Sequence, residues 1–211
     1  IEACFSPGVE NVSGFEKDCA NRNIKVFLAD KSVNAPAEKD DFFNFTSMFI
    51  GSMSNDSYMT LDNWVDSKMP DISKELLLQM DIEKAEYEVF LSLSEKTMNR
   101  FRIMVIEFHD LDQIWNLPFF GIMNRVFKKI LQTHSCVHIH PNNTGSLKWS
   151  NKIVNTNKLN GIETVQAMEF TFYKKDRINE ARYQTSFPHK LDRDNAPNEP
   201  TVVLPISWYK N

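Results

Sequence analysis

The chain has 211 residues, of which 42% are hydrophobic and 25% are charged, an ordinary balance for a globular protein that needs no disulfide or metal staples. Its net charge of −4 argues against a dedicated nucleic-acid-binding surface. No apolar run reaches the roughly 20 residues of a membrane span. The three cysteines Cys4, Cys19 and Cys136 lie far apart and show no C-x-x-C spacing. They favour a reducing compartment over a disulfide framework, so we expect a cytoplasmic protein.

Apolar runs typical of strands alternate with segments of helical spacing along most of the chain. In the first half we expect, in chain order, a strand at 1–6, a helix at 14–22, strands at 24–30 and 45–52, and a helix at 60–68. The first helix would place Phe15 and Cys19 on one face, and Thr60 is a candidate cap for the second.

The second half continues this alternation and ends in a proline-rich segment. We expect a strand at 76–81, a helix at 83–93, a strand at 101–110, a helix at 119–134, and strands at 136–143 and 165–175. The segment 187–211 holds four of the nine prolines and predicts an extended tail packed on the body formed by 1–186. Because the chain starts at Ile1, almost inside a strand, we expect a single domain, 1–211, excised from a longer polypeptide.

Alternating strands and helices predict an α/β fold, with a mostly parallel sheet covered by helices on both faces. The strands are almost continuously apolar, as strands buried on both faces are. In such sheets ligands bind beyond the carboxyl ends of the strands. The residues found at those ends are Ser6, Pro7, Gly8, Val9 and Glu10; Asp30; Gly51 and Ser52; Asp81; Glu107, His109 and Asp110; and His138, His140, Asn142 and Asn143.

The first two strand ends indicate a nucleoside site. Gly8 lets the backbone turn tightly and approach a ligand, and Asp30 can accept hydrogen bonds from both ribose hydroxyls. The chain has no G-x-G-x-x-G and no P-loop lysine, and the carboxylate of Glu10 would repel a phosphate. This pattern suits a cofactor with positive charge and no phosphate, such as S-adenosylmethionine, which has an ammonium and a sulfonium.

Several segments in a fixed order resemble FkbM-type S-adenosylmethionine-dependent methyltransferases. They are SPGVENVSGFEKD with IKVFLAD, FIGS with TLDNWV, LLLQMDIEKAEYEV, RFRIMVIEFHDL, VHIHPNN, MEFTFYKKDR and FPHKLDRDNAPNEP. The most specific of them are the LLQMDIE-x-AEYEV and IEFHDL motifs. The resemblance covers nearly the whole chain and implies a class I, Rossmann-like methyltransferase fold. That fold has a mostly parallel seven-stranded sheet with one antiparallel strand, expected at 165–173 or next to it.

The resemblance also implies an activity and a substrate class. Members of the family typically methylate hydroxyl groups, often on sugars of glycans or glycosylated metabolites, and release S-adenosylhomocysteine. We therefore expect O-methylation of a sugar hydroxyl, such as that of a deoxyhexose like rhamnose or fucose. The partner would be a carbohydrate or glycosylated small molecule rather than nucleic acid, since no basic stripe is present. Other glycan-processing domains could be fused to this one.

Two positions depart from the family pattern. Glu10 stands where the family usually has a second glycine, and it either binds the ammonium of the cofactor or weakens cofactor binding. Lys84 replaces the glycine of the usual D-x-E-G-A-E motif. Lys84 is either harmless on the exposed first turn of a helix or narrows the substrate mouth.

Three residues are candidates for catalysis. His109 ends the fifth strand beside the expected methyl position and titrates near neutral pH, so it is the first choice for a general base. Asp81 is the second choice, as a base or as the group that holds the acceptor hydroxyl. Glu107 could also hold a hydroxyl or orient His109, because a buried carboxylate needs a fixed partner.

The remaining expected site residues divide between cofactor and substrate. For the cofactor they are Ser6, Gly8, Glu10, Phe15, Asp30, Gly51, Ser52 and Asp81. For the substrate they are Glu83, Glu86, Asp110, Trp115, His140 and Asn142. Trp115, Phe119 and Phe120 could wall the acceptor pocket under Trp208 and Tyr209, although core packing is the expectation for Phe120.

Structural roles compete with these functional ones. Asp81 and Glu83 would also be favoured at the start of a helix by the helix dipole. Glu86 could lie on the surface, and His109 could serve only to bond neighbouring backbone.

A metal ion is an alternative that the sequence does not favour. His138 and His140 could bind one with His109 or Asp81, or Asp81, Glu107 and Asp110 could bind magnesium. Two rival functions also stay open. One is a non-catalytic glycan-binding or scaffolding domain with a degenerate cofactor site. The other is methylation of a non-sugar hydroxyl, which a more uniformly apolar acceptor pocket would favour.

Overall fold

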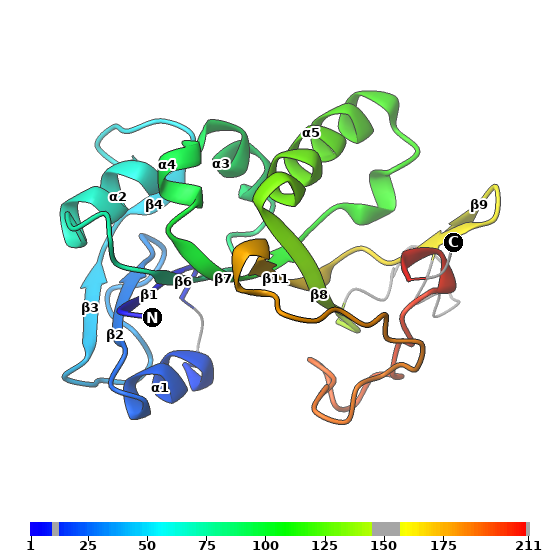
Figure 1. Ribbon diagram of the computed structural model, residues 1–211. Coiled ribbons are helices and arrows are strands. Elements are labelled where there is room, and N and C mark those ends of the chain that lie inside the picture. The colour runs from blue at the N-terminus through cyan, green and yellow to red at the C-terminus, as the bar shows by residue number, and fades with distance from the viewer. Residues whose placement is uncertain (10–12, 145–156, 210–211) are drawn as a thin grey trace.

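The computed structural model describes residues 1–9, 13–144 and 157–209. Within these residues a seven-stranded sheet runs through the molecule in the order β3-β2-β1-β6-β7-β11-β8 (Figure 1). In that order the strands are β3 (Phe43–Thr46), β2 (Lys25–Ala29), β1 (Ala3–Pro7), β6 (Leu76–Met80), β7 (Phe101–Phe108), β11 (Met168–Lys174) and β8 (His134–Pro141). Two further pairs are β4 (Phe49–Gly51) with β5 (Tyr58–Thr60), and β9 (Asn157–Leu159) with β10 (Ile162–Thr164).

The direction of the strands confirms the expected class I fold. Among the strands of this sheet that the structure describes, only β11 runs antiparallel to its neighbours, β7 and β8. The others pair in parallel, from β3 through β2, β1 and β6 to β7. The antiparallel strand, Met168–Lys174, overlaps the segment 165–173 that the sequence indicated.

Helices cover both faces of the sheet, as Figure 1 shows. On one face lies α1 (Gly14–Asn21), and on the other lie α2 (Leu61–Lys68), α3 (Glu86–Ser92), α4 (Glu95–Met98) and α5 (Leu117–Thr133). Successive side chains of the central strands point to opposite faces of the sheet. In β1, for example, Phe5 joins the larger hydrophobic cluster and Cys4 joins the smaller one. This double burial explains why the central strands are almost continuously apolar.

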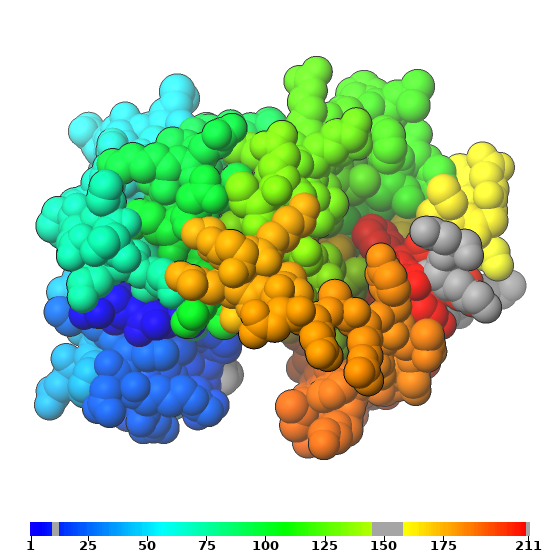
Figure 2. Space-filling model, viewed as in Figure 1, coloured from blue at the N-terminus to red at the C-terminus, as the bar shows by residue number. Residues whose placement is uncertain are grey.

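The C-terminal tail packs beside β8. His138 Nε2 lies 2.9 Å from Asp192 Oδ1, and His140 Nε2 lies 2.9 Å from the carbonyl oxygen of Arg193. Figure 2 shows the tail in orange and red against the body of the molecule, with a hollow between it and α1. No helix in the described part of the chain is both long and apolar enough to cross a membrane.

Three local expectations need correction and one is confirmed. The strand expected at 45–52 is two strands, because the chain leaves the main sheet after β3 and pairs β4 with β5. The helix expected at 83–93 begins only at Glu86. Phe15 is 39% exposed and does not share the buried face with Cys19; Glu16 turns inward instead, because its Oε1 lies 2.6 Å from Ser6 Oγ. Thr60 does cap α2, since its Oγ1 accepts the N–H of Asn63 at 3.2 Å.

Phe108, the last residue of β7, anchors the strand that leads to the candidate site. It is fully buried, and its ring lies 4.9 Å from that of Phe127, 5.3 Å from that of Tyr87 and 5.7 Å from that of Phe170, centroid to centroid. These contacts join α3, α5 and β11 around the end of β7. They fix the point from which the next residue, His109, projects.

Replacing Phe108 by alanine should therefore lower the free energy of unfolding by about 3 to 5 kcal/mol, because it removes a buried ring and leaves a cavity. Urea denaturation followed by circular dichroism measures the change. Phe120→Ala is the matched control, since that ring is 44% exposed, and its loss should stay below about 1 kcal/mol. Equal losses in the two variants would contradict this role for Phe108.

Candidate functional site

The loop after β1 turns at Gly8, as the sequence predicts. Its φ is +87°, a conformation that favours glycine. A Cβ at this position would lie 1.5 Å from the carbonyl oxygen of Asp81, so only glycine fits there. The N–H of Gly8 donates to the carbonyl of Ala29 at 3.1 Å, and the N–H of Asp81 donates to that of Pro7 at 3.3 Å. The ends of β1, β2 and β6 thus meet at Gly8.

Asp30 follows β2 and is nearly buried. Its Oδ2 accepts the N–H of Val9 at 2.9 Å, and its Oδ1 accepts both the N–H and the hydroxyl of Ser32 at 2.7 Å. A carboxylate offers about four lone-pair sites, and these contacts use three of them. The structure therefore leaves Asp30 room for about one ribose hydroxyl, not the two that we expected.

A cavity of about 420 Å³ opens between these strand ends. Its walls are Gly8, Val9, Ala29, Asp30, Ser32, Phe49, Ile50, Tyr58, Asp81, Ile82, Glu83 and Ala85. This volume falls within the range of about 300 to 1,000 Å³ typical of small-molecule sites. The cavity combines carboxylates at one side with apolar and aromatic side chains at the other.

Three of the residues expected to bind a cofactor, Gly8, Asp30 and Asp81, line this cavity. The others lie elsewhere: Ser6 Oγ is 2.6 Å from Oε1 of Gln79, Phe15 is exposed on α1, Gly51 packs against Tyr58, and Ser52 donates to Glu88 at 3.3 Å. Glu10 lies outside the described residues.

The sequence analysis missed the aromatic wall of the cavity. The rings of Phe49 and Tyr58 lie 5.3 Å apart, one from β4 and one from β5. The predicted strand at 45–52 concealed this wall, because its two halves belong to different sheets. The short apolar run around Ile50 was the available signal.

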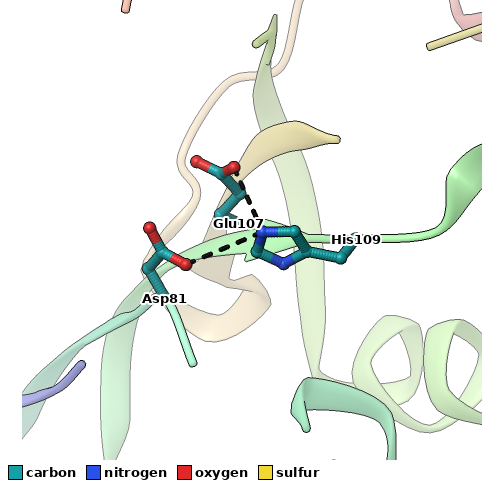
Figure 3. A group of neighbouring side chains, drawn as sticks. All are labelled: Asp81, Glu107 and His109. Atoms are coloured by element: carbon teal, nitrogen blue, oxygen red, sulfur yellow. Dashed lines mark ion pairs between the residues drawn. The ribbon is translucent and has the colours of Figure 1, made fainter. Parts of the chain in front are cut away.

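Beside the cavity, the ends of β6 and β7 bring Asp81, Glu107 and His109 together (Figure 3). Met80 pairs with Ile106 across the two parallel strands, so Asp81 stands level with Glu107. His109 is two residues beyond Glu107. Its Nε2 lies 3.5 Å from Glu107 Oε1, 3.6 Å from Glu83 Oε2 and 3.9 Å from Asp81 Oδ1.

Glu86 contacts both the loop after β6 and the ring of His109. It is fully buried, and its Oε1 accepts the N–H groups of Ile82 at 3.1 Å and Lys84 at 3.2 Å. The same oxygen lies 3.2 Å from His109 Nδ1. A buried Glu86 cannot touch a substrate hydroxyl, nor does it lie on the surface, so both sequence-based interpretations of it are wrong. Its role is to tie the loop 81–85 to the histidine.

The carboxylates around His109 set its charge. Burial disfavours the imidazolium, but the hydrogen bond with Glu86 and the negative charges of Glu86, Glu107 and Asp81 outweigh it and raise the pKa of His109 to about 9. Burial, together with the charge of Asp81, raises the pKa of Glu107 to about 7. The pKa of His109 therefore lies above the near-neutral value that the sequence indicated.

Of the other residues expected to bind substrate, Asn142 contacts the cluster of Asp81, Glu107 and His109, whereas His140 and Asp110 have other partners. Asn142 reaches the cluster, since its Nδ2 donates to Glu107 Oε1 at 2.8 Å. His140 instead bonds the tail, as does His138. Asp110 pairs with Lys84. Among the described residues, the group spaced to hold a metal ion is therefore Asp81, Glu107 and His109, and neither of the metal sets that the sequence suggested.

Lys84 has a backbone conformation that favours glycine. Its φ is +84°, and Glu83 before it has a φ of +53°. Both are left-handed conformations, which strain a residue with a side chain. The expected first helical turn is thus a strained loop. The Nζ of Lys84 lies 2.8 Å from Asp110 Oδ1, so the side chain spans from this loop to the loop after β7 and does not line the cavity.

A second, apolar pocket of about 180 Å³ lies at the start of α5. It is lined by Ile114, Trp115, Phe120, Met123, Ile162, Ser207 and Trp208. Trp115 and the tail residue Trp208 thus line one pocket. Phe120 joins them and does not pack in the core, whereas the ring of Phe119 lies 5.1 Å from that of the buried Tyr87. Tyr209 packs on Phe187.

The chain is similar to known methyltransferases. The family model of the methyltransferase FkbM domain matches residues 17–140. Among solved structures, the chain is similar to a mutant of the 16S rRNA (adenine(1408)-N(1))-methyltransferase from Catenulisporales acidiphilia, with 10% identity and a TM-score of 0.37. That match covers 82% of this chain and 84% of the other. A search of curated proteins found no match.

Gly8→Ala should destabilise the protein by roughly 3 kcal/mol or more, because the new Cβ would collide with the backbone of Asp81 in a conformation that alanine resists. Thermal and urea denaturation measure the loss. Gly121→Ala is the control: no atom lies within 4 Å of its Cβ position. Because Gly121 lies within α5, this substitution should stabilise the protein by up to about 1 kcal/mol. A Gly8→Ala protein as stable as the wild type would refute the close approach of β1 and β6.

Lys84→Gly should be more stable than Lys84→Ala by about 1 kcal/mol. Both variants lose the exposed ion pair with Asp110, worth roughly 0 to 1 kcal/mol, but only glycine relieves the left-handed strain. The difference in the free energy of unfolding between the two variants isolates the backbone term. An alanine variant more stable than the glycine variant would show that position 84 is not left-handed in solution.

Proposed function

Because the chain belongs to the FkbM methyltransferase family, we propose that it transfers the methyl group of S-adenosylmethionine to a hydroxyl group, and that the hydroxyl belongs to a sugar. The single observation that carries this proposal is the position of Asp81. This carboxylate lines the 420 Å³ cavity and also faces the cluster of Glu107 and His109. A residue shared by two adjoining spaces marks the place where a donor and an acceptor would meet.

The cavity has the chemistry that S-adenosylmethionine requires. Asp30 has room for a ribose hydroxyl, and Gly8 permits close approach of the backbone. Phe49 and Tyr58 offer rings for an adenine. Asp81 and Glu83 place negative charge where the cofactor has a sulfonium and an ammonium, whereas a dinucleotide would bring phosphates to the same acids. These features favour a cationic cofactor.

The cluster beside the cavity supports a hydroxyl acceptor. Carboxylates accept hydrogen bonds from hydroxyl groups, and Asp81, Glu83 and Glu107 surround one space. Methyl transfer is a direct displacement, so much of its rate comes from holding the acceptor oxygen in line with the sulfonium methyl. Asp81 is the residue that we assign to that task, since it borders both spaces.

Lys84 argues against the rival interpretation of a degenerate cofactor site. The lysine that replaces the family glycine turns to Asp110 and leaves the cavity open. A non-catalytic scaffolding role therefore has no support from this substitution.

One observation favours a second candidate acceptor. Apart from Ser207, the 180 Å³ pocket is lined by apolar and aromatic side chains, among them Trp115, Phe120 and Trp208. Aromatic rings can stack on a sugar, but so apolar a pocket also suits an alcohol with a hydrocarbon or aromatic skeleton. Methylation of such a non-sugar hydroxyl is the alternative function.

Calorimetric titration of the chain with S-adenosylhomocysteine tests the cofactor site. We expect micromolar binding that falls by roughly tenfold or more, about 1.4 kcal/mol, in Asp30→Ala. The matched control is Asp18→Ala, which removes an exposed acid on α1 and should leave binding unchanged. Thermal denaturation of each variant verifies the fold, because Asp30 also holds the loop after β1. A folded wild-type chain that binds nothing at millimolar ligand would overturn the proposed function.

A labelling experiment with the same protein distinguishes the two classes of acceptor. Incubation with methyl-labelled S-adenosylmethionine and free or linked deoxyhexoses, beside apolar alcohols without a sugar, shows which class gains the label. Trp115→Ala should reduce labelling of either class, because it opens the apolar pocket. Label on apolar alcohols alone would replace the sugar by the alternative acceptor.

A further inference from the structure

Asp81, Glu107 and His109 each offer one possible ligand atom to the same small space (Figure 3). Each residue contributes one ligand atom, and all three atoms lie within 4.8 Å of one another. From His109 Nε2, the carboxylate oxygens of Glu107 and Asp81 are 3.5 Å and 3.9 Å away. Ordinary N–H···O bonds are about 2.7 to 3.2 Å long. The cluster is therefore wider than a set of direct hydrogen bonds.

These separations match those of ligands around one ion. Nitrogen and oxygen ligands bind zinc, magnesium and calcium at about 2.0 to 2.6 Å. Two such ligands at the angles of tetrahedral or octahedral coordination lie about 3.0 to 4 Å apart. The distances from Nε2 fall inside this interval.

Two of the three residues, His109 and Glu107, are also held by other side chains. Glu86, which is fully buried, bonds Nδ1 of His109 and so turns Nε2 toward the carboxylates. A histidine that ligates a metal typically has its other ring nitrogen held by a carboxylate or a carbonyl in this way. Asn142 likewise holds Oε1 of Glu107. His109 itself is only 6% exposed, so its surroundings hold the ring with Nε2 toward the carboxylates.

We propose that Asp81, Glu107 and His109 bind a divalent cation. Two carboxylates and one imidazole suit ions such as Mn²⁺, Fe²⁺ and Zn²⁺, which accept both oxygen and nitrogen ligands. Glu83, with a side chain 73% exposed and an oxygen 3.6 Å from Nε2, is the further ligand available from the solvent side. Its exposure leaves the mouth of the site open to an incoming ion or ligand.

The consequence for catalysis rests on the proposed function, whereas binding of the ion does not. A cation beside the cofactor cavity would hold the acceptor oxygen and favour its deprotonated form. That position lies next to Asp81, where the two spaces join. The ion would thus add to the orientation that the carboxylates provide.

Titration of the metal-stripped chain with Mn²⁺, followed by electron paramagnetic resonance, tests the site without cofactor or acceptor. We expect one saturable site per chain. Glu107→Gln and His109→Ala should abolish it, and Glu86→Gln should weaken it roughly 10- to 100-fold by loosening the ring of His109. Asp112→Asn is the control, since Asp112 lies outside the three-residue cluster; it should bind as the wild type does.

A measurement on the unaltered protein guards against variants that fail to fold. Mn²⁺ should broaden the ring resonances of His109 and leave those of His134 sharp, because His134 bonds the carbonyl of Phe101 at the other end of β7. No saturation at millimolar Mn²⁺, or equal binding by folded Glu107→Gln, would overturn the assignment. Binding of S-adenosylhomocysteine to the metal-free chain is scored separately, so a failed metal site and a failed cofactor site remain distinguishable.

Discussion

The buried carboxylate of Glu86 is the interaction on which the rest of the site depends. An unpaired charge is costly to bury, and Glu86 is fully enclosed at the start of α3. One of its oxygens therefore takes the N–H groups of Ile82 and Lys84 and contacts Nδ1 of His109. The carboxylate thus fixes a loop that follows β6 and a ring that follows β7. Moving either one would leave the charge of Glu86 without its partners, so the relative position of the two strand ends is set by electrostatics as well as by the sheet.

Three residues near the Glu86 carboxylate have strained backbone conformations. Glu83, Lys84 and Asp110 all have positive φ, and two of them form an ion pair across the mouth of the site. Strained residues persist only where their surroundings over-determine them, and they cluster at functional sites. Here the surroundings are the N–H groups held by Glu86 on one side and the aromatic packing of Phe108 on the other. The strain is consistent with a loop shaped for a ligand rather than for stability.

The sequence predicted the parts of the fold that depend on local pattern. The central strands were recognisable because burial on both faces makes them continuously apolar, and Gly8 and Asp30 because they end the first two of them. Glu86 was misjudged because its burial depends on His109, a residue 23 positions further along the chain. Phe120 was misjudged for a similar reason: helical spacing cannot distinguish the core from a pocket whose opposite wall, Trp208, comes from the tail. Most errors thus concern contacts between segments, although the strand at 45–52 and the start of the helix at 83–93 were also predicted wrongly.

Lys84 adds a positive charge beside the cavity but does not fill it, because its side chain pairs with Asp110. A lysine in this backbone conformation is strained, yet its Nζ lies 2.8 Å from Asp110 Oδ1 in the loop after β7. Asp81 and Glu83 line the cavity, whereas Asp110 pairs with Lys84. A glycine there would leave Asp110 facing the mouth unpaired by this lysine, and a more acidic entrance would result. Lys84 therefore changes the charge beside the cavity and leaves the cavity itself open.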